Sequence, residues 1–301
     1  MLVVASDEVA QARRDGTPLV ALESTVYSHL GLPSPHNAEA LRRSIDTIEE
    51  VGAVAAITAI IDGVPRAGLD SSEHERILGP AMKVAERDIS VAVGRQVSVG
   101  ATTVSASLAL AESAGISVFA TGGIGGVHRG AAQSFDVSAD LASIAKRRVA
   151  TISAGAKSFL DIPATLELLE TLGVPVLGWC TDRFPAFTAR NSTETLTHQV
   201  ESMPELVAIA KAQLEHGGLL VANPVPTEAA LDQHLHDRAL EQALRSAAEA
   251  GINGPALTPH VLAAMAEATE GESIPANIAL LENNCRVAAS LAVGLAEART
   301  R

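Results

Sequence analysis

Short apolar runs rich in Val, Ile and Ala alternate along the chain with longer segments whose apolar residues recur every three or four positions. The short runs are typical of strands buried in a parallel sheet, and the longer segments of helices packed on it. We predict strands at residues 18–22, 53–61, 64–69, 89–93, 116–120, 149–153, 174–177 and 219–222. We predict helices at residues 36–51, 103–113, 160–172 and 206–215. This order indicates an α/β fold with a largely parallel sheet.

Beyond Pro226 the pattern changes to helices alone. These predicted helices span residues 227–250, 258–268 and 274–298, and they form a helical C-terminal segment that must pack on the sheet or against another subunit. The chain shows no internal repeat and no low-complexity linker, so we expect a single domain over residues 1–301.

Composition limits the classes of partner. The formal charge of −13 disfavours binding to nucleic acid, and the aromatic content of 2% disfavours both base stacking and an aromatic membrane belt. The two cysteines have no metal-ligand or redox spacing, which suits a reducing compartment. No leader-like N-terminus and no uninterrupted apolar run of about 18 residues is present. We therefore expect a soluble, cytoplasmic protein that acts on a small molecule.

Lys157 is the first candidate for catalysis. It ends the segment Ile-Ser-Ala-Gly-Ala-Lys-Ser at residues 152–158, and only four of the 22 basic residues of the chain are lysines. An amine that loses its proton and attacks a carbonyl carbon must be lysine, because arginine stays protonated. The alternative is a lysine that extends from the end of a strand into solvent.

Two further residues stand beside predicted strands or charged segments. Glu23 ends the first strand, where burial would raise the pKa of its carboxyl and make it a proton shuttle. The alternative is a structural carboxylate satisfied by backbone amides. Lys83 is a candidate for binding or catalysis. The alternative is a surface lysine, because it precedes the charged segment 86–88 and such segments are usually solvated.

A glycine-rich segment at residues 121–130 follows another predicted strand, where α/β proteins place ligand-binding loops. Its spacing fits neither a dinucleotide-binding fingerprint nor a phosphate-binding P-loop. It delivers His128 and Arg129, and Asp136 and Asp140 follow. Either aspartate is equally explained as a helix cap or a solvated helix residue.

Together these segments resemble the pseudouridine-5′-phosphate glycosidase family. The resemblance rests on residues 21–25, 59–63, 100–104, 119–130, 135–140, 154–158, 185–187 and 221–224, which occur in family order. It implies an α/β/α sandwich and the reversible cleavage of the C–C glycosidic bond of pseudouridine 5′-phosphate to uracil and ribose 5-phosphate. It also implies a Mn²⁺-assisted homotrimer.

The resemblance assigns roles residue by residue. Lys157 matches the nucleophile, which joins the open-chain ribose as a Schiff-base adduct, and Glu23 matches the proton donor. Asp136 matches the Mn²⁺ ligand. The residues that match substrate contacts are Lys83, Val104, His128, Ser138, Ala139, Asp140 and Asn277.

The chain also departs from the family pattern. Glu86 stands where an arginine is usual, and Trp179 and Cys180 replace a common Tyr-Gln pair. These changes spare every residue with a predicted chemical role. From the residues alone, two other functions stay open: a Schiff-base aldolase acting on another sugar phosphate, and a noncatalytic sugar-phosphate-binding protein.

Overall fold

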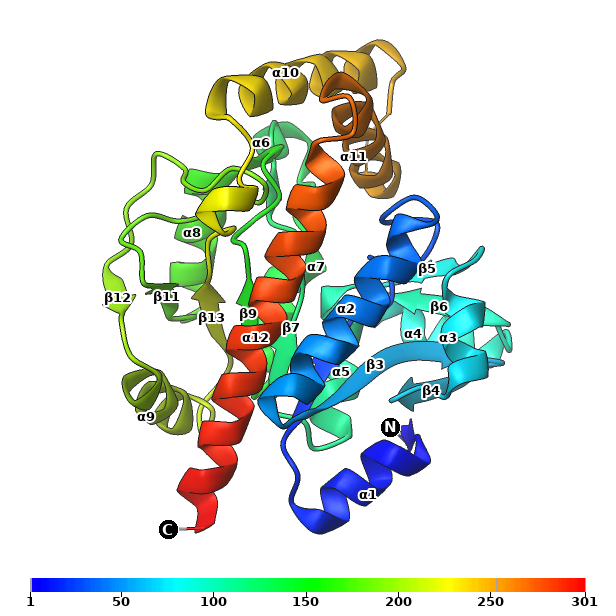
Figure 1. Cartoon of the computed structure of the whole chain (residues 1–301). Coiled ribbons are helices and arrows are strands. Elements are labelled where there is room, and N and C mark those ends of the chain that lie inside the picture. The colour runs from blue at the N-terminus through cyan, green and yellow to red at the C-terminus, as the bar shows by residue number, and fades with distance from the viewer. Residues whose placement is uncertain (1, 253, 301) are drawn as a thin grey trace.

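An 11-stranded mixed sheet lies at the centre of the molecule in the computed structural model, which describes residues 2–252 and 254–300 (Figure 1). Its largest part is parallel and runs in the order β3 (Val54–Ile61), β2 (Leu19–Leu22), β7 (Val118–Ala120), β9 (Ala150–Ser153), β13 (Leu219–Ala222), β11 (Val176–Trp179) and β12 (His198–Val200). At the β3 edge the sheet adds β1 (Val4–Ala5), β4 (Val64–Ala67), β5 (Met82–Val84) and β6 (Val99–Thr102), with β4 and β6 antiparallel to β3. The largely parallel sheet is therefore confirmed.

Helices cover both faces of this sheet. Alternate residues of β13 divide between two apolar cores, Leu219 and Val221 on one face and Leu220 and Ala222 on the other. The first core includes α2 (His36–Val51), α9 (Met203–Gln213) and α12 (Ser273–Thr300). The second includes α1 (Asp7–Asp15), α5 (Val104–Ser113), α7 (Ala139–Lys146) and α8 (Ile162–Thr171). This arrangement confirms the α/β/α sandwich.

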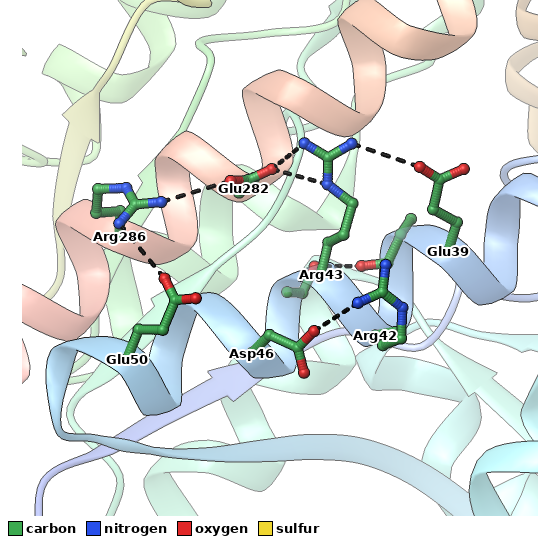
Figure 2. Close-up of polar contacts among 9 residues, drawn as sticks. Glu39, Arg42, Arg43, Asp46, Glu50, Glu282 and Arg286 are labelled. Atoms are coloured by element: carbon green, nitrogen blue, oxygen red, sulfur yellow. Dashed lines mark hydrogen bonds and ion pairs between the residues drawn. The ribbon is translucent and has the colours of Figure 1, made fainter.

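The pair α2 and α12 is joined at its solvent edge by ion pairs (Figure 2). Arg43 of α2 donates from Nε to Glu282 of α12 over 2.9 Å, and Arg286 of α12 lies 4.0 Å from Glu50 of α2. Because these groups are partly exposed, the buried face between the helices contributes most of the packing energy. By length and composition α12 could cross a membrane, but 61% of its most apolar stretch is buried, as in a core helix of a soluble protein.

The C-terminal hairpin of α10 (Gln233–Glu249) and α11 (Leu257–Ala268) lies at the top of the view in Figure 1, beyond the upper end of α2. The shorter helices are α3 (Ser71–Ile77), α4 (Ile89–Gly94) and α6 (Ala131–Ser134), and β8 (Val127–His128) pairs with β10 (Leu160–Asp161). Single 3₁₀ turns span Glu86–Asp88, Thr227–Ala229 and Gly254–Ala256.

The predicted strand at residues 89–93 is wrong, because this segment forms α4. Ile89 and Ala92, three positions apart, are buried, whereas Val91 and Val93 are 41% and 36% exposed. The spacing of the buried residues is helical, but a run of five mostly apolar residues is too short to reveal it in the sequence.

Candidate active site

A cavity of about 370 Å³ opens where the parallel strands β2, β7 and β9 end. This is the edge at which open α/β sheets place their ligands. Glu23 follows β2 directly, the glycines from Gly122 onward follow β7, and Lys157 lies four residues after β9. All ten residues predicted for the site line this one cavity: Glu23, Lys83, Val104, His128, Asp136, Ser138, Ala139, Asp140, Lys157 and Asn277.

The turn before Lys157 fixes the direction of its side chain. Gly155 has a φ of 72°, and a Cβ at this position would lie 2.0 Å from the carbonyl oxygen of Pro185. Only glycine fits there. The backbone N–H of Lys157 then donates to the carbonyl of Ile124 over 3.1 Å, which ties the turn to the glycine-rich segment. The lysine is thus held at the cavity wall by backbone contacts on both sides.

Glu23 is buried, with 7% of its surface exposed, and Thr121 donates a short hydrogen bond to its Oε1 atom. Burial raises the pKa of the Glu23 carboxyl, and the positive charge of Lys157 and the Thr121 hydrogen bond offset part of that rise. The expected direction of the pKa shift is therefore confirmed. A carboxyl that keeps its proton more readily than usual is suited to act as a general acid.

Two buried asparagine side chains hold the backbone of Thr121 in place. Asn284 of α12 donates from Nδ2 to the carbonyl of Thr121 over 2.7 Å, and Asn223, after β13, donates to Asn284 Oδ1 over 2.9 Å. Both asparagines are at most 2% exposed. Neither Thr121 nor Asn284 was predicted from the sequence, although Thr121 begins the glycine-rich segment.

Lys83 lies on β5, opposite Ala101 of β6. Burial lowers the pKa of its amine, and the neighbouring charge of Lys157 lowers it further, against the attraction of Asp140 and Glu23. Two amines thus share one cavity with a carboxyl, and Lys83 is the cationic neighbour of Lys157.

Asp140 links the glycine-rich segment to two helices. Its Oδ1 accepts from the backbone N–H of Ser105 in α5 over 3.0 Å, and its Oδ2 accepts from that of Gly125 over 2.8 Å. Ser138 caps α7, and a Cβ on Gly125 would lie 2.3 Å from its Oγ. Asp140 lines the cavity, but both of its oxygens already hold backbone amides. A direct contact with substrate stays a prediction.

His128 and Asp136 lie side by side on the cavity wall. The backbone N–H of His128 donates to the carbonyl of Asp136 over 3.0 Å, and His128 Nδ1 lies 3.8 Å from Asp136 Oδ2. The side chain of Asp136 is 35% exposed. Burial lowers the pKa of His128.

No three His, Cys, Asp or Glu side chains within the described ranges are grouped to hold a metal ion. A single half-exposed carboxylate such as Asp136 fits only an ion that keeps several waters and binds the ligand's own oxygens, as Mg²⁺-like ions do.

Several other residues of the cavity wall were not predicted. Arg87 lines it, whereas Arg129, the neighbour of His128, is exposed and does not. Phe187 and the α11 residues Pro259 and Leu262 complete the wall. Pro259 and Leu262 look like ordinary core positions in the sequence, so no pattern marks them as part of a site, whereas Phe187 belongs to the segment 185–187 on which the family resemblance rests.

Comparison with known proteins agrees with this geometry. The family model "Indigoidine synthase A like protein" matches residues 8–294. The chain belongs to this family. A relative from Sorangium cellulosum, named pseudouridine-5′-phosphate glycosidase, is 47% identical over 97% of this chain and 93% of its own length. Another of that name, from Herpetosiphon aurantiacus, is 48% identical over 97% of this chain and 98% of its own.

Two solved structures share the fold of this family member. The prealnumycin C-glycosynthase AlnA, in complex with ribulose 5-phosphate, superposes with a TM-score of 0.90 at 34% identity, covering 100% of this chain and 99% of that one. An indigoidine synthase A-like protein from Thermotoga maritima has a TM-score of 0.87 at 36% identity, and the match covers 98% of this chain and 97% of that one.

Proposed function

We propose that this chain is a pseudouridine-5′-phosphate glycosidase, which reversibly cleaves the C–C glycosidic bond of pseudouridine 5′-phosphate to give uracil and ribose 5-phosphate. The observation that carries the proposal is the convergence of Lys157, Lys83 and Glu23 in one cavity, in a chain 47% identical to relatives of that name over nearly its whole length. An amine and a proton donor are the two groups that cleavage of such a bond requires.

The chemistry divides a difficult cleavage into easier steps. As the ribose ring opens, the C1′–O4′ bond breaks and O4′ takes a proton, while the amine of Lys157 loses one and forms a single bond to C1′. Glu23 gives its proton to C5 of uracil, the bond between C1′ and C5 breaks with its electron pair going to uracil, and uracil departs. The adduct that remains between C1′ and Lys157 is an iminium, which is its Schiff-base character. Water then hydrolyses the iminium, which releases ribose 5-phosphate and restores the amine. Because Thr121 donates to Oε1 of Glu23, the other oxygen, Oε2, is the one that carries the transferred proton.

Asp136 supports a role for Mn²⁺. Its carboxylate is a hard oxygen donor on the cavity wall, beside an imidazole nitrogen of His128 that has no hydrogen bond in the part of the chain described. When bound, such an ion supplies positive charge beside a phosphorylated sugar. His128 and Lys83 orient the phosphorylated ribose, and Asn277 contacts the base.

Two exposed apolar side chains beside Asp136 support assembly into a homotrimer. Phe135 is 85% exposed and Val137 is 41% exposed, on either side of Asp136. Large apolar side chains at this exposure favour burial against another subunit. Native mass spectrometry is expected to give three times the chain mass, and Phe135→Asp to give monomer. Cys180 and Cys285, which form no disulfide, suit the cytoplasm.

The direct test is the release of uracil from pseudouridine 5′-phosphate, followed by chromatography with and without Mn²⁺. Borohydride added during turnover is expected to attach ribose phosphate irreversibly to Lys157, detected by peptide mass. An aldolase would instead cleave sugar phosphates without dependence on a uracil base. Absence of uracil release under all metal conditions would overturn the proposal.

A further inference from the structure

A second cavity of about 190 Å³ lies beside the active-site cavity. The two share the residues Leu30, Gly31, Leu32, Phe187, Pro259, Leu262 and Asn277 as a common wall. The second cavity extends away from Lys157 and Glu23, which do not line it, toward the start of α12 and the inner face of α11. Catalytic groups therefore stand on one side of this wall only.

The lining of the second cavity is mostly apolar. Its own residues, beyond the shared wall, include Met265 and Ala266 of α11 and Ile274 of α12. An apolar cavity next to a base-binding site recovers free energy when an apolar group enters it. Its chemistry does not match a phosphate, because none of the described residues that line it is a lysine or an arginine.

Two buried polar atoms at this cavity have no hydrogen-bond partner among the residues that the structure describes. Asn277, which borders both cavities, is 7% exposed, and Thr188 is 2% exposed. The Oδ1 atom of Asn277 and the Oγ1 atom of Thr188 make no hydrogen bond with any described residue. Burying such groups without a partner is costly. The Oδ1 atom of Asn277 therefore points to a ligand with a polar atom at the boundary between the cavities, whereas Thr188 lines the second cavity alone.

Phe187 fixes the position of the wall. It has a left-handed φ of 62°, which is rare for a bulky residue, and its ring packs so closely on Gly123 that a Cβ there would lie 2.7 Å from Cδ2. The backbone N–H of Phe187 donates to the carbonyl of Ala154 over 2.9 Å. The strained backbone is thus held beside the turn that carries Lys157, and the opening between the cavities is defined by rigid groups.

We propose that the second cavity is an extension of the base site, which takes a short alkyl group attached to the edge of uracil that lies away from the glycosidic carbon. This inference rests on the proposed function. Uracil is joined to ribose through C5, and its two ring nitrogens, N1 and N3, lie on the edge away from C5. With Asn277 contacting that edge, a substituent on one of these nitrogens enters the second cavity.

The test measures inhibition in the direction of synthesis, with uracil and ribose 5-phosphate as substrates. The inhibitors are 1-methyl-, 1-ethyl- and 1-propyluracil, and the corresponding series alkylated on N3. In one of the two series the inhibition constant is expected to fall by about three- to fourfold for each added CH₂, the value of burying one methylene. In the other series the alkyl group points away from the second cavity, so the inhibition constant is not expected to fall as CH₂ groups are added.

Variants separate this cavity from the active site. Ala266→Phe fills the second cavity and not the active-site cavity. It is therefore expected to abolish the gain in inhibitor affinity per CH₂ while leaving the KM of uracil within twofold. Ala263→Phe, at an exposed position that also lines only this cavity, gives the same result if Ala266→Phe folds poorly. Ala268→Phe, on the same helix but lining neither cavity, is the matched control and keeps the gain.

Two results would overturn the inference while leaving the proposed function standing: flat or weakening inhibition in both series, or an undiminished gain in both filled variants. Failure to use uracil itself would overturn the proposed function, and this inference with it.

Discussion

The floor and the cap of the active-site cavity are built in opposite ways. The floor, formed by Glu23, Thr121 and the turn before Lys157, consists of groups whose positions are fixed by hydrogen bonds to backbone and buried amides. The cap, formed by Pro259 and Leu262 of α11 with Asn277 of α12, is mostly apolar. We infer that the floor sets the reaction, because chemistry needs fixed geometry, while the cap sets which base fits.

The helix of the cap, α11, is joined to its neighbour α10. His260 of α11 and Ser246 of α10 share a hydrogen bond of 3.0 Å, which joins the two helices of the hairpin. A substitution in the floor is therefore expected to lower kcat, and one in the cap to change KM for the base.

The most severe test of the floor is Lys157→Ala. Loss of the nucleophile is expected to lower kcat by about 10⁴-fold or more. Lys157→Arg should be as inactive, because guanidinium keeps its proton and forms no adduct. Lys211→Ala, on α9 and outside the cavity wall, is the control. Near-normal rates in both Lys157 variants, measured by uracil release, would show that the reaction does not pass through this amine.

A second test separates the acid, Glu23 in the floor, from the proposed metal ligand, Asp136 on the cavity wall. Glu23→Gln is expected to lose about 10²- to 10⁴-fold in kcat at every Mn²⁺ concentration, because the amide cannot donate the proton. Asp136→Ala is expected to lose less and to regain part of its activity as Mn²⁺ is raised. Uracil release is titrated against Mn²⁺ for both variants. Superimposable titration curves would mean that these roles are wrongly assigned.

The difference between the two regions also explains what the sequence could predict. Glu23 and Lys157 are polar residues at the ends of apolar strands, so they stand out in the pattern, and a parallel sheet brings such ends together. Leu262 and Pro259 carry no chemical signal, because the same residues would occur in any helix that packs on a core. Only the folded hairpin shows that they face the cavity.

Asn284, which supports the floor, could not be predicted from the sequence for a different reason. Asn284 lies 163 positions from Thr121, and its amide acts on a backbone carbonyl rather than on a motif. Short segments were also ambiguous, as the helix α4 shows, because five residues cannot distinguish a strand from a helical turn.

A subtler change of the floor concerns the proton on Glu23. Thr121→Val keeps the shape of the side chain but removes the hydrogen bond that lowers the pKa of Glu23. That pKa should therefore rise further. The acid must be protonated to work, so the alkaline limb of the kcat/KM profile should move to higher pH. A shift toward lower pH would contradict the role of Glu23 as proton donor. Ser113→Ala, on α5 away from the cavity, is the control.

The smallest effect is expected at the rim, where Arg87 lines the cavity but its side chain is 80% exposed. The protein carries a formal charge of −13, so a phosphorylated substrate is attracted only by local cations. Because solvent screens an exposed arginine, Arg87→Ala should raise KM for pseudouridine 5′-phosphate by only about two- to fivefold and leave kcat unchanged. Added salt should reduce this difference in KM. Arg95→Ala is the control, because Arg95 is exposed and lies outside the cavity wall, and it should leave KM unchanged. An equal rise in KM for unphosphorylated pseudouridine would show that Arg87 contacts the base or the sugar instead. A large fall in kcat would place Arg87 with the fixed groups of the floor rather than with the rim.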